Sequence, residues 1–225
     1  MSKQWSLKTV ALAHGYESIW NYECDDFIFF LAYARIFSSK ITGILDIGHG
    51  VRPLPYSTPI FKTDPSKSSH LPLELKTYVG VEINDVVIEV CNKEKESNPV
   101  ESDISVKFFK QDIEREFSKD FDKALKDCNL VFMDSTITML EDPLSFVLKM
   151  SKKVDWIYLR RTPLFQNTKK SKFEWGGMSE PSVVWSLGED FYKKLHGIIT
   201  IFFTSWHKSP CPDSDDIIIL DCRNV

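Results

Sequence analysis

Short apolar runs recur along the chain, and several of them end in a charged residue that is followed by polar or glycine-rich sequence. Runs of this length, rich in β-branched and aromatic residues, are typical of buried strands. They predict seven strands, over Gly43–Ile47, Tyr78–Glu82, Val106–Lys110, Asn129–Asp134, Trp156–Arg160, Ile198–Thr204 and Ile217–Asp221. The segments between the early strands are long enough for crossover connections, which predicts parallel pairing.

Apolar residues at roughly helical spacing predict helices before and between the strands. Residues 5–14 and 22–37 are predicted to be helices of an N-terminal region, residues 1–40, that packs on the core. Val86–Glu96 and Pro143–Lys152 are the clearest connecting helices.

The last two predicted strands are joined by a stretch rich in proline, serine and aspartate, which leaves no room for a crossover helix. We therefore expect an antiparallel pair at the sheet edge. The expected fold is a single α/β domain over residues 1–225. Its sheet is Rossmann-like and doubly wound, with seven strands, mostly parallel, and an antiparallel C-terminal hairpin strand.

Composition narrows the range of partners. The 225 residues suffice for one α/β domain with a sizeable core. A net charge of -4 and a pI near 5.8 disfavour nucleic acid as a partner. The most apolar helix candidate, Phe27–Phe37, is too short to span a bilayer, so no membrane partner is expected. The five cysteines form no CxxC pair, which predicts no metal site and reduced thiols in a cytoplasmic protein.

The stretch from Ile44 to Gly50, ILDIGHG, is the most informative for chemistry. A buried strand that stops at a Gly-x-Gly turn lets a ligand approach the backbone with no side chain in the way. The next predicted strand ends at Glu82, where a carboxylate can accept hydrogen bonds from a ribose diol. Together these features predict a nucleoside-containing cofactor across the carboxyl ends of a parallel sheet.

An NAD-binding protein would share the glycine turn and the ribose acid. Its pattern Gly-x-Gly-x-x-Gly requires a third glycine where this chain has Pro53. The Tyr-x-x-x-Lys pair of short-chain dehydrogenases is also missing, because Tyr158 is followed four residues later by Thr162, and Tyr192 by His196. The sequence therefore disfavours NAD.

Asp46, Gly48 and Gly50 resemble the Asp-x-Gly-x-Gly pattern of class I S-adenosylmethionine-dependent methyltransferases, which also combine five parallel strands with a terminal hairpin. The resemblance implies S-adenosyl-L-methionine as cofactor. The two glycines would close on its methionyl part, and Asp46 would act on its ammonium group directly or through water. The other implied contacts are Glu82 to the ribose, Asp112 to the adenine amino group, Ile83 and Ile113 to the adenine ring, and Asp134 with Ser135 beside the methyl group.

Three later segments make the resemblance more specific. They are DSTITMLEDP after the fourth strand, RRTPLF after the fifth, and FEWGGMSEPSVVWSLGEDF before the last two. Together they resemble a family of methyltransferases found in bacterial lipopolysaccharide and surface-polysaccharide gene clusters. The resemblance implies an aromatic cap segment over residues 163–190, with a helix that starts at its Trp-Ser pair. It also implies a small-molecule acceptor, a sugar or nucleotide-sugar.

No residue stands out as a catalytic base. The candidates for catalysis are Asp134, to orient the acceptor or accept its proton, and Arg161, to bind a phosphate or carboxylate of the acceptor. A structural salt bridge would explain Arg161 equally well. Arg160 is expected on the opposite face, because side chains alternate along a strand. His49, inside the glycine turn, is expected to have a backbone role.

The segment over residues 51–72 contains five prolines, which allow at most short helical turns. It is interpreted either as part of a lid or acceptor site, or as a surface insertion. Trp175 and Trp185 could stack on a sugar face, although such dense aromatic residues more often pack the core or a cap.

The expected function is S-adenosylmethionine-dependent methyl transfer to a sugar or glycan precursor of surface polysaccharide. Two alternatives stay open. One is a catalytically silent binding or scaffold protein that keeps the cofactor fold. The other is a protein or nucleic-acid methyltransferase, although the Asn-Pro-Pro-Tyr motif of amino-methylating enzymes is absent after the fourth strand.

Overall fold

The structure is a computed structural model that describes residues 40–50, 53–57, 73–99, 104–162, 164–173, 182–204 and 216–225. The helices predicted over residues 5–14 and 22–37 lie outside the described residues. The chain divides into two compact units: Met1–Asp112 with Phe117–Asn129, and Ile113–Glu116 with Leu130–Val225. Each unit is described by itself below, and the single domain expected over residues 1–225 stays a prediction.

The first unit contains three parallel strands, β1 (Ile41–Ile47), β2 (Leu73–Glu82) and β3 (Ser105–Lys110). β2 pairs in parallel with both β1 and β3, and Asp46 lies opposite Gly80 in the register. The central residues of β1 and β2 are almost fully buried, as their unbroken apolar sequence predicts. The predicted parallel pairing of these strands is confirmed.

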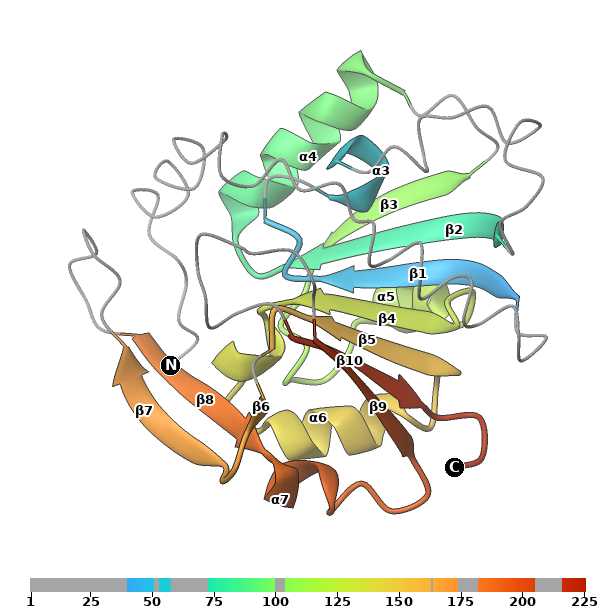
Figure 1. Ribbon diagram of the computed structural model, residues 1–225. Helices are drawn as coiled ribbons and strands as arrows, with labels where there is room; N and C mark the ends of the chain where they lie inside the picture. Colours follow the sequence, from blue (N-terminus) through green and yellow to red (C-terminus); the bar gives the residue numbers. More distant parts are fainter. Residues whose placement is uncertain are drawn as a thin grey trace. The chain divides into compact units, whose positions relative to one another are not determined.

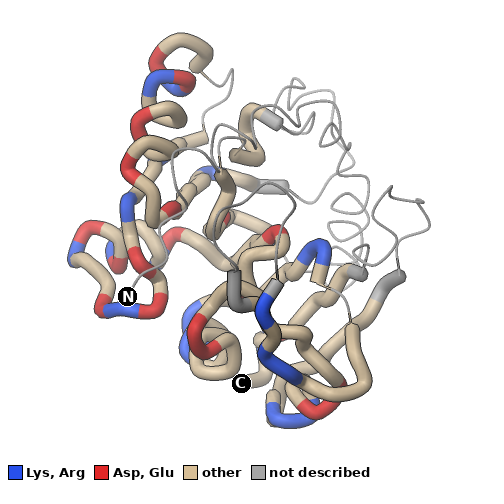
Figure 2. The backbone as a smooth tube through the Cα atoms, turned by 90° about the vertical axis from the view of Figure 1, so that its left-hand side faces the viewer, with Lys and Arg blue, Asp and Glu red and all other residues tan. Residues whose placement is uncertain are grey.

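The helices of the first unit are α3 (Leu54–Ser57), α4 (Asp85–Ser97) and α5 (Lys119–Leu125). α4 begins after Asn84, whose side-chain oxygen accepts a hydrogen bond from the Val86 amide at 2.9 Å, and its outer turns carry charges of both signs (Figure 2). The connecting helix predicted over Val86–Glu96 is confirmed. α3, a single turn of four residues, is the short helix that the prolines allow.

The second unit contains four further strands of the large sheet, drawn in Figure 1. They are β4 (Leu130–Asp134), β5 (Trp156–Arg160), β9 (Ile199–Thr204) and β10 (Asp216–Asp221). β4 and β5 are parallel, whereas β10 is antiparallel to both β5 and β9. The predicted antiparallel hairpin is therefore confirmed, with β9 as the edge strand and β10 inside it.

The strand order is β3-β2-β1 in the first unit and β4-β5-β10-β9 in the second. All seven predicted strands are present, with boundaries that differ by a few residues at most, apart from the earlier start of β2. The predicted Rossmann-like fold, mostly parallel with an antiparallel C-terminal strand, is confirmed.

The second unit also contains η2 (Ile137–Met139), α6 (Pro143–Met150) and α7 (Glu189–Tyr192). α6 starts where predicted, because Asp142 accepts a hydrogen bond from the Ser145 amide at 3.0 Å and Pro143 occupies the first helical position. No helix among the described residues is long and apolar enough to cross a membrane.

A second sheet lies within the segment expected to form an aromatic cap. Its strands are β6 (Leu164–Phe165), β7 (Lys169–Phe173) and β8 (Ser182–Gly188), in the order β6-β8-β7. The helix start expected at the Trp-Ser pair is wrong, because Trp185 and Ser186 lie in β8 and pair with β7. The β-branched Val183 and Val184 favour a strand here, and the helix begins only at Glu189.

Candidate functional site

The glycine turn follows β1 directly. Gly48 and Gly50 have left-handed backbone, with φ of 70° and 58°, and the Gly48 amide donates to the Val81 carbonyl at 2.8 Å. A Cβ atom added to Gly50 would meet no atom of the described residues within 4 Å. Glycine is therefore favoured at position 50 by its dihedral angle, while the space beside its backbone stays open to a ligand.

Glu82 ends β2 beside this turn. Its Oε1 accepts a hydrogen bond from the Ile83 amide at 2.8 Å, and its Oε2 accepts one from the Gly50 amide at 3.3 Å. Burial raises the pKa of the Glu82 carboxyl above its ordinary value, and these backbone donors oppose the rise. The carboxylate is thus fixed at the glycine turn and only partly buried.

Asp46 lies deeper, with only 2% of its surface exposed. Its Oδ2 accepts hydrogen bonds from the Tyr78 hydroxyl at 2.5 Å and from the Leu54 amide at 3.4 Å. Burial, followed by the charge of Asp46, raises the pKa of Tyr78 well above its ordinary value. Asp46 therefore connects β1 to β2 and to the start of α3, while its expected contact with a cofactor ammonium group stays a prediction.

His49 points its ring into the first unit. Nδ1 donates to the Gly50 carbonyl at 2.5 Å, and the ring lies 5.4 Å from that of Phe108. A Cβ atom on Gly80 would come within 2.9 Å of this ring, so the glycine in β2 makes room for it. Burial lowers the pKa of His49 to about 4, which keeps the imidazole neutral at pH 7. These contacts agree with the expected backbone role.

The thiol of Cys91 on α4 lies 3.9 Å from His49 Nδ1. Burial, with smaller contributions from Asp46 and Glu82, raises the pKa of this thiol to about 12. Cys91, Cys128 and Cys222 are buried free thiols, whereas Cys24 and Cys211 lie outside the described residues. Because thiolate is the reactive form, Cys91 is unsuited to nucleophilic chemistry.

Asp112 and Ile113 follow β3. Asp112 lies two residues beyond the strand and is partly buried, in the first unit, while Ile113 is 7% exposed and belongs to the second unit. The next acid, Glu114, accepts hydrogen bonds from the amides of Glu141 and Asp142, each at 2.9 Å. Glu114 therefore fixes the turn before α6, a role that the sequence did not reveal.

In the second unit, the Asp134 carboxylate lies between two arginines. Oδ1 accepts a short hydrogen bond from Arg161 Nε, and Oδ2 accepts one from an Arg160 guanidinium nitrogen at 3.4 Å. The three side chains are 16–23% exposed. The expectation that Arg160 lies on the opposite face is wrong. Arg160 lies opposite Asp134 in the register of β4 and β5. Arg161 has a φ of 49°, which breaks the strand alternation and brings its guanidinium group to the same carboxylate.

Ser135 is also left-handed, with a φ of 57°. Its amide donates to the Arg160 carbonyl at 2.9 Å, and its hydroxyl donates to the Arg161 carbonyl at 3.4 Å. The ends of β4 and β5 are thereby joined at two adjacent left-handed residues. Strained non-glycine backbone of this kind is concentrated at functional sites.

Trp185 is engaged in packing. Its indole nitrogen donates to the Leu140 carbonyl at 2.9 Å, and the Lys170 ammonium lies 5.0 Å from the ring centre. These contacts anchor β8 to the turn that follows Asp134 and Ser135. Trp175 and most of the proline-rich segment over 51–72 lie outside the described residues.

Comparisons with known proteins bear on the fold. No protein-family model matches the chain, and a search of curated proteins finds no match. Among solved structures, an S-adenosylmethionine-dependent methyltransferase from Clostridium acetobutylicum ATCC 824 is 10% identical, with a TM-score of 0.55 over 94% of this chain and 97% of the other. The fold is that of the class I methyltransferases.

Two further methyltransferase structures are similar. The N-terminal domain of EvdMO1, solved with S-adenosylhomocysteine bound, has 14% identity and a TM-score of 0.54 over 84% of this chain and 77% of the other. The small RNA methyltransferase HEN1 has 14% identity and a TM-score of 0.53 over 88% of this chain. This chain spans only about 25% of HEN1.

Within this methyltransferase fold, each unit brings part of the predicted site together. The first joins Gly50 to Glu82, and the second joins Asp134, Ser135 and Arg161. Tyr78 and Arg160 were missed as partners of the two aspartates. Tyr78 gave a sequence signal, because Asp46 lies opposite Gly80 and residues 78 and 80 share one face of β2. The left-handed backbone that brings Arg161 to the side of Arg160 gave none.

Proposed function

We propose that this protein binds S-adenosyl-L-methionine and transfers its methyl group to a small-molecule acceptor, a sugar or glycan precursor of surface polysaccharide. The observation that carries the proposal is the Glu82 carboxylate, held against the open backbone of Gly50. A nucleoside cofactor needs both features, a carboxylate for its ribose and a backbone surface without side chains.

Glu82 suits a ribose diol for a specific reason. Backbone amides of Ile83, Gly50 and Asn84 donate to its two oxygens, which together offer about four acceptor positions. Ribose hydroxyls would donate to the same oxygens while these amides hold the carboxylate still. The ribose would then meet a group that is already oriented, which lowers the entropic cost of binding.

The remaining cofactor contacts in this proposal follow the methyltransferase resemblance. Gly48 and Gly50 would face the methionyl part, and Asp46 its ammonium group. Because Asp46 is almost fully buried, a contact through water fits its surroundings better than a direct one. The other proposed contacts are Asp112 to the adenine amino group, Ile83 and Ile113 to the adenine ring, and Asp134 with Ser135 beside the methyl group.

For the acceptor, we propose that Arg161 binds an anionic group such as a phosphate or carboxylate of a nucleotide-sugar, and that Asp134 orients it. Both Asp134 oxygens accept hydrogen bonds from guanidinium groups, which favours orientation over proton removal. The surface-polysaccharide setting rests on the RRTPLF and aromatic segments. The N-terminal domain of EvdMO1 was also crystallised in the presence of S-adenosylhomocysteine and D-fucose, with a TM-score of 0.51 to this chain.

Calorimetry with S-adenosylhomocysteine tests the cofactor site. We expect the unchanged protein to bind it, and Glu82→Ala to weaken binding by about 1–3 kcal/mol, because ribose hydroxyls would be left unpaired. Asp112→Ala should cost less, since adenine would still pack on Ile83 and Ile113.

Glu89→Ala is the matched control, because Glu89 is an exposed glutamate on α4. It should leave affinity unchanged. Absence of binding heat and of a thermal shift with either S-adenosylmethionine or S-adenosylhomocysteine would refute the proposal and favour a scaffold role. Unchanged affinity in a folded Glu82→Ala protein would show that this carboxylate does not bind the ribose.

A further inference from the structure

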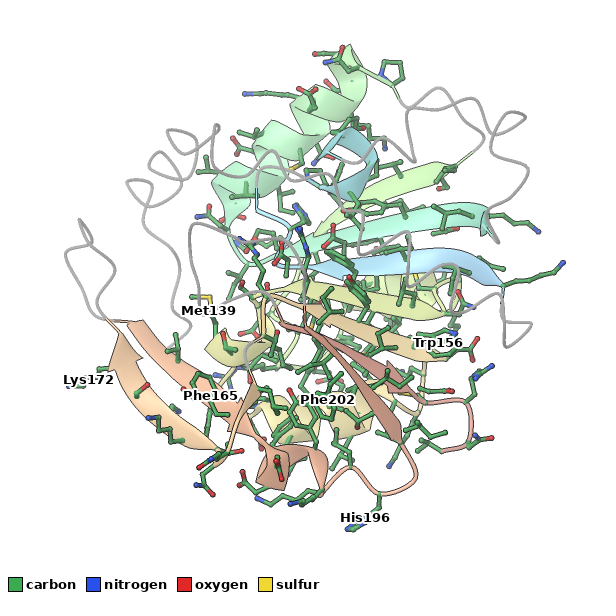
Figure 3. All side chains as sticks on the ribbon, in the orientation of Figure 1. Met139, Trp156, Phe165, Lys172, His196 and Phe202 are labelled. Carbon is green, nitrogen blue, oxygen red and sulfur yellow. The ribbon has the colours of Figure 1, made fainter. Side chains whose placement is uncertain are left out.

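The outer strands of the two sheets differ in how they are protected. An edge strand exposes unpaired backbone groups, and natural proteins often place lysine there to discourage pairing with another chain. β3, at one edge of the large sheet, carries exposed Lys107 and Lys110. β7, at an edge of the small sheet, carries exposed Lys169, Lys170 and Lys172, the last of which is labelled in Figure 3.

β9, at the other edge of the large sheet, has no such protection. Its sequence, ITIFFT, contains no charged residue, no proline and no glycine. Ile199 is 53% exposed and Phe202 is 44% exposed, two of the most exposed large apolar side chains among the described residues. The two are three positions apart, so they lie on opposite faces of the strand. Phe202, labelled in Figure 3, has the Tyr192 ring 5.1 Å away.

We propose that β9 pairs with the same strand of a second copy of this chain, antiparallel across a two-fold axis. Such an interface is isologous, since each copy offers the same strand and needs no other surface. Two uncharged strands meet without the like-charge repulsion that two copies of β3 or β7 would suffer. The proposal is independent of the proposed function.

A specific register follows from symmetry. Side chains directly opposite each other share a face, and the two-fold axis keeps each side chain on its own face, so the axis must place one residue opposite itself. Centred on Ile201, it places Ile201 opposite Ile201 of the partner subunit, and Ile199 opposite Phe203 of the partner subunit. The flanking pairs are aliphatic against aromatic, a combination that stabilises neighbouring strands. The two large sheets would then continue into each other through β9.

Light scattering after size-exclusion chromatography of the full chain tests the proposal. We expect a dimer at micromolar concentration. Ile199→Lys should raise the dimer dissociation constant by about tenfold or more, because each copy would then place a charged lysine against β9 of the other copy. Phe165→Lys is the matched control. Phe165 is 39% exposed but lies on β6, so this change lowers surface hydrophobicity equally and should leave the dimer intact.

Hydrogen exchange distinguishes two possible partners for the outer edge of β9, a second copy of the chain and another part of the same chain. The amides of β9 should be protected at high protein concentration and should lose protection on dilution below the dissociation constant. A chain that stays monomeric over the whole concentration range would overturn the proposal. So would a dimer that survives Ile199→Lys in a folded protein, or β9 protection that does not depend on concentration.

Discussion

Left-handed backbone occurs at the carboxyl ends of strands in both units, but different residues adopt it. After β1 it is adopted by Gly48 and Gly50, and after β4 and β5 by Ser135 and Arg161. Gly50 and Ser135 have nearly the same φ, 58° and 57°. In the first unit the left-handed residues are glycines, which have no side chain and leave room beside the backbone. In the second unit they are Ser135 and Arg161, which keep their side chains despite the strain, and Arg161 donates a hydrogen bond to Asp134.

The two carboxylates near these turns, Glu82 and Asp134, differ in the groups that donate hydrogen bonds to them. Glu82 accepts hydrogen bonds from neutral backbone amides, whereas Asp134 accepts them from two guanidinium groups. The first arrangement leaves a charge for ligand hydroxyls to meet. In the second, two guanidinium groups share one carboxylate. The first is suited to a neutral diol, and we propose the second for an anionic group.

Removing the Asp134 carboxylate should have the largest effect on stability. In Asp134→Ala, Arg160 and Arg161 would be left without their shared partner in a largely desolvated position. We expect a loss of about 2–3 kcal/mol in the free energy of unfolding, measured in urea. Glu189→Ala is the control, because it breaks an ion pair in the same unit with Lys193 that is 59–74% exposed. It should cost less than about 0.5 kcal/mol. Equal losses would show that the arginines do not depend on Asp134.

Exchanging residue types at the two left-handed turns should have a smaller effect, in opposite directions. Gly50→Ala should destabilise the protein by about 1–2 kcal/mol through its dihedral angle, since the added Cβ meets no atom in the part of the chain that the structure describes. Ser135→Gly relieves the same strain but loses a 3.4 Å hydrogen bond, so we expect a gain within about 1 kcal/mol. Urea unfolding of both variants measures this, and a destabilised Ser135→Gly would mean that its hydroxyl matters more than the strain.

The sequence predicted the large sheet well, because each strand is an apolar run bounded by charge, glycine or proline. The small sheet was missed for a physical reason. β7, KKSKF, carries lysines at exposed edge positions, so it lacks the apolar run by which a buried strand is recognised. β8 contains an apolar run, but its place in the resemblance led to a predicted helix start. Pairing with β7, which is a tertiary contact, decides its structure.

The site was predictable at its glycines and less so at its charges. Gly48, Gly50 and Glu82 could be placed because a strand end and a turn fix them locally. The convergence of both arginines on Asp134 could not, because it depends on the left-handed backbone of Arg161, which alternation along a strand does not foresee. Arginine gives no sign of a positive φ in the way that glycine does.

The smallest expected effect concerns the protonation of Glu82. Burial raises the pKa of its carboxyl in the folded protein above the ordinary value of 4.5, so the folded state binds this proton more tightly than the unfolded chain. The resulting stability is fully present below about pH 4.5 and is lost as pH rises through the folded pKa. Glu82→Gln cannot ionise and should escape this loss. Urea unfolding of both proteins across this pH range should therefore show the variant gaining relative stability as pH rises, by about 1 kcal/mol or less.

The lost acceptor toward the Gly50 amide adds only a constant offset, so the pH dependence isolates the ionisation. Glu89→Gln, on the exposed side of α4, is the matched control for replacing a glutamate by glutamine. If Glu82→Gln runs parallel to the unchanged protein, the carboxylate is solvated in the folded protein, and the contrast with the arginine-bound Asp134 loses its electrostatic basis.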